Sequence, residues 1–159
     1  AGLMVLLRTP EPSRDYVGPK GAAALTLDVF TQDPTGSAVR LVDGATLPAS
    51  SALRFQVRPA APCYVWLVSS DAQGQVSKLY PLASEPAFVT ETITLPGGAT
   101  LDGQAGPERL FAICTPTPLP FEAVEAAAKT NGVEGVRRHA RLEGLEGQAT
   151  VLLEKGAAP

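Results

Sequence analysis

Short runs of alternating apolar and polar residues follow one another along most of the chain. The clearest run is ALRFQVRP (52–59), in which Leu53, Phe55 and Val57 alternate with arginine and glutamine. Because successive side chains of a β-strand point to opposite faces, this run predicts a strand with one buried and one solvated face. CYVWLV (63–68) is apolar on both faces, which is typical of a central strand covered on both sides.

Six other stretches also fit strands, with turn residues rich in Gly, Pro, Asp and Ser between them. These expected strands are 23–30, 38–42, 75–81, 87–95, 108–114 and 148–155. Asp71 and Gly74 belong to a hairpin loop longer than the tight two-residue kind. Short strands at this spacing indicate a β-sandwich or a barrel.

The pattern predicts one helix, FEAVEAAAKT (121–130), which Asn-Gly then ends. Phe121, Val124 and Ala128 lie along one stripe of this helix, so it would cap the sandwich with an apolar face. The segment that follows, VEGVRRHARLEGLEG (133–147), fits either an irregular loop or a second short helix.

Length and composition indicate a single, mainly β domain. The chain has 159 residues, which is long enough to bury a core, and 45% of them are hydrophobic. Its 15 Gly and 15 Pro suit many short strands joined by turns better than a helical protein. We expect an antiparallel β-sandwich, immunoglobulin-like or jelly-roll-like, over residues 22–155, with a frayed C-terminus at 156–159.

The N-terminal stretch AGLMVLLR (1–8) leaves two alternatives open. It could be a first strand or a tail, or it could be the end of a membrane helix. On the second interpretation residues 9–21, which are rich in Pro and polar residues, would be a juxtamembrane linker. We therefore separate residues 1–21 from the sandwich as a tail or linker.

A succession of landmarks between residues 23 and 130 resembles the domain-of-unknown-function 4384 family, bacterial modules often joined to signalling or membrane-anchored proteins. The landmarks are DG-x-x-L (43–47), ALRFQVRP (52–59), YVWLVSSDAQGQVSKLYP (64–81), TLP (94–96) and GPERLFAI (106–113). Each motif is only a turn or a strand, but their order and spacing are more specific. The resemblance implies an all-β module appended to other domains, with no catalytic residues to carry over.

The two cysteines, Cys63 and Cys114, are not part of the family's pattern. Cys63 begins one expected central strand and Cys114 ends another. If these strands are antiparallel neighbours, the two Cα atoms could come within the roughly 4.4–6.8 Å that a disulfide requires. A disulfide would favour an oxidising, extracytoplasmic compartment, whereas parallel or separated strands would leave two buried thiols.

The sequence holds little that could carry catalysis. A nucleophilic cysteine needs a base, and the chain's single histidine is His139. There is no G-x-S-x-G motif, and the two cysteines and the histidine are scattered along the chain rather than spaced as metal ligands. We expect no enzyme activity, no cofactor and no metal site.

Two groups of residues are candidates for a ligand or partner face. Tyr64, Trp66 and Tyr80 either form an exposed aromatic face or fill the core, and we assign Trp66 mainly to the core because its strand is apolar on both sides. The second group is a basic cluster, either a solvated face or a docking site for an acidic partner or anionic lipid. It comprises Arg137, Arg138 and Arg141.

Charge narrows the expected partners. Only 18% of the residues are charged and the formal net charge is −3, which argues against nucleic acid. We expect a non-catalytic interaction or sensor module with a protein partner. It would be the periplasmic or otherwise extracytoplasmic part of a protein anchored through a segment before residue 1, with a cytoplasmic location still open. The alternative is a carbohydrate-binding sandwich that stacks sugar rings on exposed aromatics.

Overall fold

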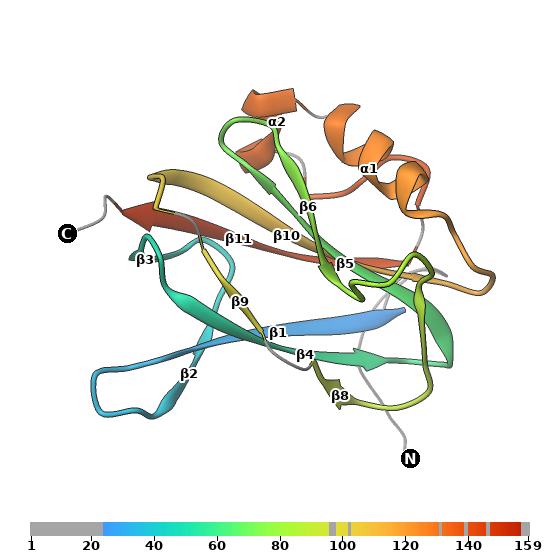
Figure 1. Cartoon of the computed structure of the whole chain (residues 1–159), viewed down its shortest axis with the longest axis horizontal. Coiled ribbons are helices and arrows are strands. Elements are labelled where there is room, and N and C mark those ends of the chain that lie inside the picture. The colour runs from blue at the N-terminus through green and yellow to red at the C-terminus, as the bar shows by residue number, and fades with distance from the viewer. Residues whose placement is uncertain are drawn as a thin grey trace, which may run out of the picture.

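Figure 1 shows a computed structural model in which two β-sheets face each other and both helices lie on the outer side of one of them. The structure describes residues 24–95, 98–101, 103–130, 132–138, 140–145 and 147–156. The expected tail and linker at residues 1–21, and residues 157–159 of the expected frayed C-terminus, lie outside the described residues.

In the described part of the chain, eleven strands build the two sheets and two helices accompany them. In chain order they are β1 (Leu25–Gln32), β2 (Ala38–Leu41), β3 (Ala45–Pro48), β4 (Ala52–Pro59), β5 (Cys63–Asp71), β6 (Val76–Tyr80), β7 (Ala87–Val89), β8 (Ile93–Thr94), β9 (Ala99–Thr100), β10 (Gly106–Thr115), α1 (Phe121–Thr130), α2 (Gly132–Arg138) and β11 (Gln148–Gly156). Gly156, which the sequence assigned to the frayed end, is the last residue of β11.

The five-stranded sheet has the order β2-β1-β4-β8, and β9 also pairs with β4. The six-stranded sheet has the order β3-β11-β10-β5-β6, and β7 also pairs with β5. The mainly β sandwich is confirmed. Among the described strands all pairings are antiparallel, as expected, except that of β3 with β11, which is parallel.

The parallel pair arises where the chain crosses from one sheet to the other at Asp43-Gly44. The N–H of Gly44 donates to the Leu152 carbonyl at 2.7 Å, and the Leu152 N–H donates to Asp43 Oδ1 at 2.7 Å. These bonds hold the turn against β11, so the chain enters β3 running in the same direction as β11. β3 was not among the strands expected from the sequence.

The expected single strand at 87–95 is wrong, because the segment crosses between the sheets. β7 pairs with β5 in the six-stranded sheet, whereas β8 pairs with β4 in the five-stranded sheet. Val89 and Leu95 are both buried, and the residues between the two strands are mostly exposed. The apolar residues therefore continue through 87–95, although the hydrogen-bonding partner of the segment changes from β5 to β4.

The main core lies between the sheets and is built from the alternating apolar positions of the long strands. Leu53, Phe55 and Val57 of β4 are buried, as the alternation predicts. On β5, the central strand, Val65 and Leu67 face this core, while Trp66 and Val68 face a second cluster on the outer side. The expectation that β5 is covered on both faces is confirmed.

The helices cover the outer face of the six-stranded sheet. α1 has its expected bounds and buries Val124 and Ala128 against the second cluster. The alternative of a second short helix is confirmed by α2. Arg109, buried in β10, donates hydrogen bonds from Nε to the Val136 carbonyl at 2.7 Å and from Nη2 to the Arg137 carbonyl at 2.9 Å. It thus satisfies the last carbonyls of α2 and binds the helix to the sheet.

Candidate functional site

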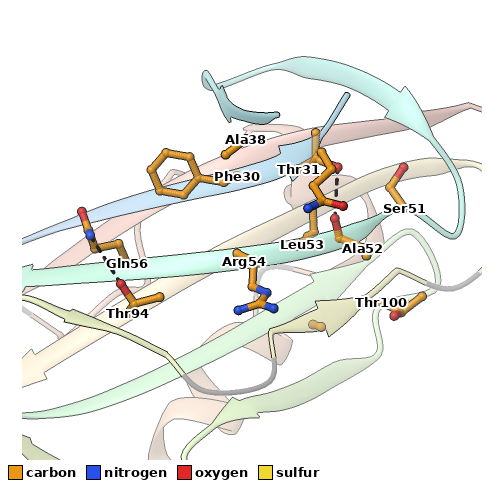
Figure 2. Close-up of a pocket in the computed structure, with 12 residues that line it drawn as sticks. Phe30, Thr31, Ala38, Ser51, Ala52, Leu53, Arg54, Gln56, Thr94 and Thr100 are labelled. Atoms are coloured by element: carbon orange, nitrogen blue, oxygen red, sulfur yellow. Dashed lines mark hydrogen bonds between the residues drawn. The ribbon is translucent and has the colours of Figure 1, made fainter. Parts of the chain in front are cut away.

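A groove of about 620 Å³ lies on the outer face of the five-stranded sheet. Both helices lie on the other sheet, so neither covers this face (Figure 1). Side chains from β1, β2, β4, β8 and β9 line the groove, most of them polar (Figure 2). The groove is larger than the hollow beside Arg137 and Arg138, which measures about 460 Å³.

Strand register places an aromatic ring between two arginines on the outer face of this sheet. Phe30 of β1 lies directly opposite Arg40 of β2 on one side and Arg54 of β4 on the other. Directly opposite residues of neighbouring strands share a face, with Cβ atoms about 4.5–5.5 Å apart. Phe30 is half-buried and both arginines are exposed, which produces a transverse row Arg40–Phe30–Arg54.

The charges on this face do not cancel. Asp28 is 8% exposed, and its carboxylate receives Arg40 Nε at 2.8 Å while Arg58 Nη2 lies 3.7 Å away. Arg54 has no ion pair or hydrogen bond from its side chain to any described residue. Three arginines against one aspartate leave a formal charge of +2 on the described strands of this sheet, in a chain of net charge −3.

Two threonine hydroxyls flank Arg54 along the outer edge of the sheet. Thr94 lies opposite Gln56 and Thr100 lies opposite Ala52, so Arg54 falls between them by register, as Figure 2 also shows. Gln56 Nε2 donates to Thr94 Oγ1 at 3.5 Å, a long contact that leaves the threonine hydroxyl hydrogen available. The two threonines are about 13 Å apart by strand rise, so the guanidinium between them could bind an oxyanion with a hydroxyl to either side.

Gly98 allows the edge of the sheet to approach Arg54 closely. Its φ is +61°, and a Cβ at this position would collide with the Leu53 carbonyl and lie 3.2 Å from Arg54 Cδ. A residue with a side chain would therefore push away the segment that carries Thr100. The edge geometry beside Arg54 depends on this glycine.

Trp66, a candidate for an aromatic face, lies in the core. It is 1% exposed, and its Nε1 donates to the Leu119 carbonyl at 2.7 Å. Its ring meets that of Phe121 edge to face at 5.5 Å, and Lys78 Nζ lies 5.0 Å from its centroid. The indole therefore connects β5 to the segment that leads into α1.

Tyr64 and Tyr80 do not join Trp66 on one exposed surface. Tyr64 is partly exposed and stacks on Phe88 of β7, with ring centroids 4.9 Å apart. Tyr80 is partly buried and packs against the core between the sheets, on the other side of β5 from Trp66. The structure does not bring the three aromatics together.

The three arginines of the basic cluster each contact a nearby acceptor. Arg137 forms a bidentate pair with Glu154, with Nε–Oε2 at 2.8 Å and Nη2–Oε1 at 2.9 Å. Arg138 lies 3.8 Å from Glu134 one turn earlier, and Arg141 donates to the Leu145 carbonyl at 3.1 Å. The neighbouring His139 lies outside the described residues. Because acids neutralise two of the three, this cluster is less suited than the groove to an acidic partner.

Arg137→Gln is expected to lower the free energy of unfolding near neutral pH only slightly, since the pair with Glu154 is partly exposed. The hydrogen bond from Arg137 lowers the pKa of Glu154 below its ordinary 4.5, although partial burial opposes the shift. A lowered folded-state pKa stabilises the fold above the unfolded value, and this contribution disappears as the pH falls through the folded value.

Urea unfolding of wild type and Arg137→Gln at pH values from 7 down to the acid limit of folding measures this difference. The two curves should converge below the lowered pKa of Glu154. Arg138→Gln is the matched control, since its long pair with Glu134 is the more exposed of the two. A difference that persists unchanged in acid would show that Arg137 acts through something other than this carboxylate.

Cys63 and Cys114 lie on antiparallel neighbouring strands, β5 and β10, and their Sγ atoms are joined in a disulfide with Cα atoms 5.5 Å apart. Cys114 is directly opposite Val65, so Cys63 is its diagonal neighbour on the same face. Both residues are buried, at 4% and 8% exposure.

We expect no free thiol in protein that is purified without reductant, unfolded in guanidinium and titrated with a thiol reagent. The same protein should show two thiols after reduction. Finding two thiols in the unreduced sample would contradict the disulfide and remove its support for an oxidising compartment.

The groove residues were not among the predicted site residues. Phe30 gave a weak signal, because it is an aromatic residue on the polar face of the alternating run in β1. Arg54 gave none, because arginine is ordinary on the solvated face of a strand. Their combination depends on the register between β1 and β4, which the sequence does not display.

The described residues contain no cluster of three or more His, Cys, Asp or Glu side chains arranged to hold a metal ion. In the same part of the chain, neither helix is long and apolar enough to cross a membrane.

The match to a known family is confined to the middle of the chain. The family model described as a domain of unknown function, DUF4384, matches residues 46–118. This range contains β4 to β10, and therefore the groove strands β4, β8 and β9, but neither β1 nor β2. No curated protein and no solved structure matches the chain. The resemblance to the DUF4384 family seen in the sequence is confirmed over residues 46–118.

Proposed function

We propose that this chain is a non-catalytic interaction module that binds a protein partner through the outer face of its five-stranded sheet. One observation carries the proposal: the groove on this face contains a half-buried aromatic ring beside an arginine that has no ion pair within the described residues. Aromatic and arginine side chains are the residues that most often dominate binding energy at protein interfaces.

The asymmetry of the sandwich supports the same proposal. The outer face of the six-stranded sheet is used for packing, since α1, α2 and the segments around them bury it. The outer face of the five-stranded sheet has no such layer within the described residues, and it is the face that carries the groove. Binding there would leave the core and the helices undisturbed.

We place the module outside the cytoplasm, in a protein anchored to a membrane. The disulfide between Cys63 and Cys114 supports an oxidising compartment. The apolar composition of residues 1–8 supports anchoring. The match to the DUF4384 family over residues 46–118 is consistent with the module appended to other domains that the resemblance implies.

Affinity capture with two matched double variants tests the proposed face. The groove variant is Phe30→Ser with Arg54→Glu. The control is Phe88→Ser with Arg138→Glu, which makes the same changes at an exposed ring and an exposed arginine outside the groove. Wild type and control are expected to retain the same partner, which is then purified and titrated by calorimetry, and the groove variant should lose it.

Equal melting temperatures of the three proteins establish that all are folded. Retention of the partner by the groove variant, or equal loss from both variants, would overturn the proposed face. If the retained species were a polysaccharide and binding depended on Tyr64 or Phe88, the carbohydrate-binding alternative would replace the proposal.

A further inference from the structure

We infer that the groove takes an acidic, extended protein segment, in which one carboxylate binds Arg54 and an apolar side chain two residues away packs on Phe30. This inference rests on the proposed function and specifies the chemistry of its partner. Its central observation is an arginine in a groove between two threonine hydroxyls, with no acid of the described chain to neutralise it.

The other arginines of the face explain why Arg54 is the anchor. Among the described strands of this sheet, Asp28 is the only acid, and both Arg40 and Arg58 converge on it. Arg54 is opposite Phe30 rather than beside Asp28, and it points to the other edge of the sheet, between Thr94 and Thr100 (Figure 2). A carboxylate from outside the chain would complete this arrangement.

The donors around Arg54 suit a carboxylate. A guanidinium presents parallel N–H groups to two carboxylate oxygens, and such charge-assisted bonds are stronger than neutral ones. Thr94 accepts a contact from Gln56 and has its own hydrogen left to donate, and the Thr100 hydroxyl has no hydrogen bond to any described residue. A neutral ligand would satisfy the hydroxyls but leave the guanidinium without a counter-charge.

Phe30 sets the spacing of the segment. Its Cβ lies directly across β1 and β4 from that of Arg54, and the Arg54 side chain extends farther toward the edge. In an extended segment, residues i and i+2 lie on the same side about 6.6–6.8 Å apart. A partner segment can therefore place an apolar side chain on Phe30 and, two positions later, the carboxylate of an Asp or Glu at Arg54.

Charge favours an acidic segment over a basic or neutral one. The described strands of the five-stranded sheet carry +2, whereas the whole chain carries −3, and the one charged residue that lines the groove, Arg54, has no acid paired with it among the described residues. Such a patch steers an acidic partner to the correct face and discriminates against basic ones.

NMR titration with two blocked peptides tests the inference. The first peptide repeats Leu-Ser-Glu-Ser, so that Leu and Glu are two positions apart. The second peptide has Gln in place of each Glu. We expect the first peptide to shift amide resonances of β1, β4, β8 and β9 in ¹⁵N-labelled protein. The second should bind at least about tenfold more weakly, as expected when a charged hydrogen bond is lost.

Two single arginine variants provide the matched comparison. Arg54→Gln should weaken the acidic peptide at least about tenfold, whereas Arg138→Gln, with the same loss of charge outside the groove, should weaken it less than about twofold. Equal weakening by both variants would mean general electrostatic attraction and would overturn the inference. Shifts outside the groove, or no binding at millimolar peptide, would overturn it as well.

Failure of the inference can be distinguished from failure of the proposed function. If both peptides bind the groove equally, the acidic class is wrong while the interaction face stands. If the partner capture fails as well, the proposed function falls with it. Shifts at the groove on diluting wild-type protein without peptide would show that a second copy occupies the face, which would also overturn an acidic partner segment.

Discussion

Replacing Lys155 with methionine is expected to lower the free energy of unfolding by about 3–5 kcal/mol, because it leaves Glu108 buried without its counter-charge. The Lys155 side chain is 1% exposed and that of Glu108 11%, and Nζ lies 2.9 Å from Oε1. Both residues point between the sheets, since their neighbours in alternation, Leu110 and Leu153, belong to the main core. For a domain of this size the loss corresponds to a drop in Tm of roughly 6–20 °C.

The double variant Lys155→Met with Glu108→Leu separates the charge from the packing. Removing both members of a buried pair and filling the space with apolar atoms is often nearly neutral, so the double variant should regain most of the stability. Urea unfolding, monitored by circular dichroism, measures the free energy of unfolding of wild type, of Lys155→Met and of the double variant. A cost below about 1 kcal/mol for Lys155→Met would indicate that water reaches the pair and that burial does not set its energy.

Trp66→Ala is expected to destabilise the domain by about 3–5 kcal/mol, the usual range for deleting a large buried aromatic side chain. The variant loses the contacts with Phe121 and Lys78, and the Leu119 carbonyl loses the indole N–H as its hydrogen-bond donor. Because domains are stable by only about 5–15 kcal/mol, this is a large part of the total stability and should appear as a clearly lower Tm.

Two further variants test the cause of this loss. Trp66→Phe keeps most of the buried area and removes the hydrogen bond, so it should cost clearly less than Trp66→Ala. Leu82→Ala removes an apolar side chain that is 81% exposed and should change little. Unchanged melting of Trp66→Ala together with loss of a bound ligand would assign the indole to a binding site rather than to the core.

Much of the local structure could be predicted from the periodicity of the sequence. The two-residue period of ALRFQVRP identified the buried face of β4, and the apolar residues on both faces of CYVWLV identified β5 as the covered central strand. The helical spacing of Phe121, Val124 and Ala128 located α1. These features depend on burial and on side-chain direction within one element, and both leave a periodic mark in the sequence.

The candidate site could not be predicted in this way. Phe30 and Arg54 are 24 positions apart in the chain, and they meet because β1 and β4 pair in a register that puts them opposite each other. A shift of that register by one residue would turn every side chain of one strand to the other face. Whether Tyr64, Trp66 and Tyr80 share one face also depended on strand pairing, since Tyr80 faces the core on the other side of β5 from Trp66.

The sequence by itself determined the mainly β class, the buried faces of the long strands, the position of α1 and the burial of Trp66, because each follows from the periodicity of a single segment. Only the tertiary structure decided which strands are neighbours. It set β3 parallel to β11, divided 87–95 between two sheets and brought Cys63 beside Cys114. Strand pairing is decided by packing between segments far apart in the chain, and the sequence of one strand does not specify which strand it pairs with.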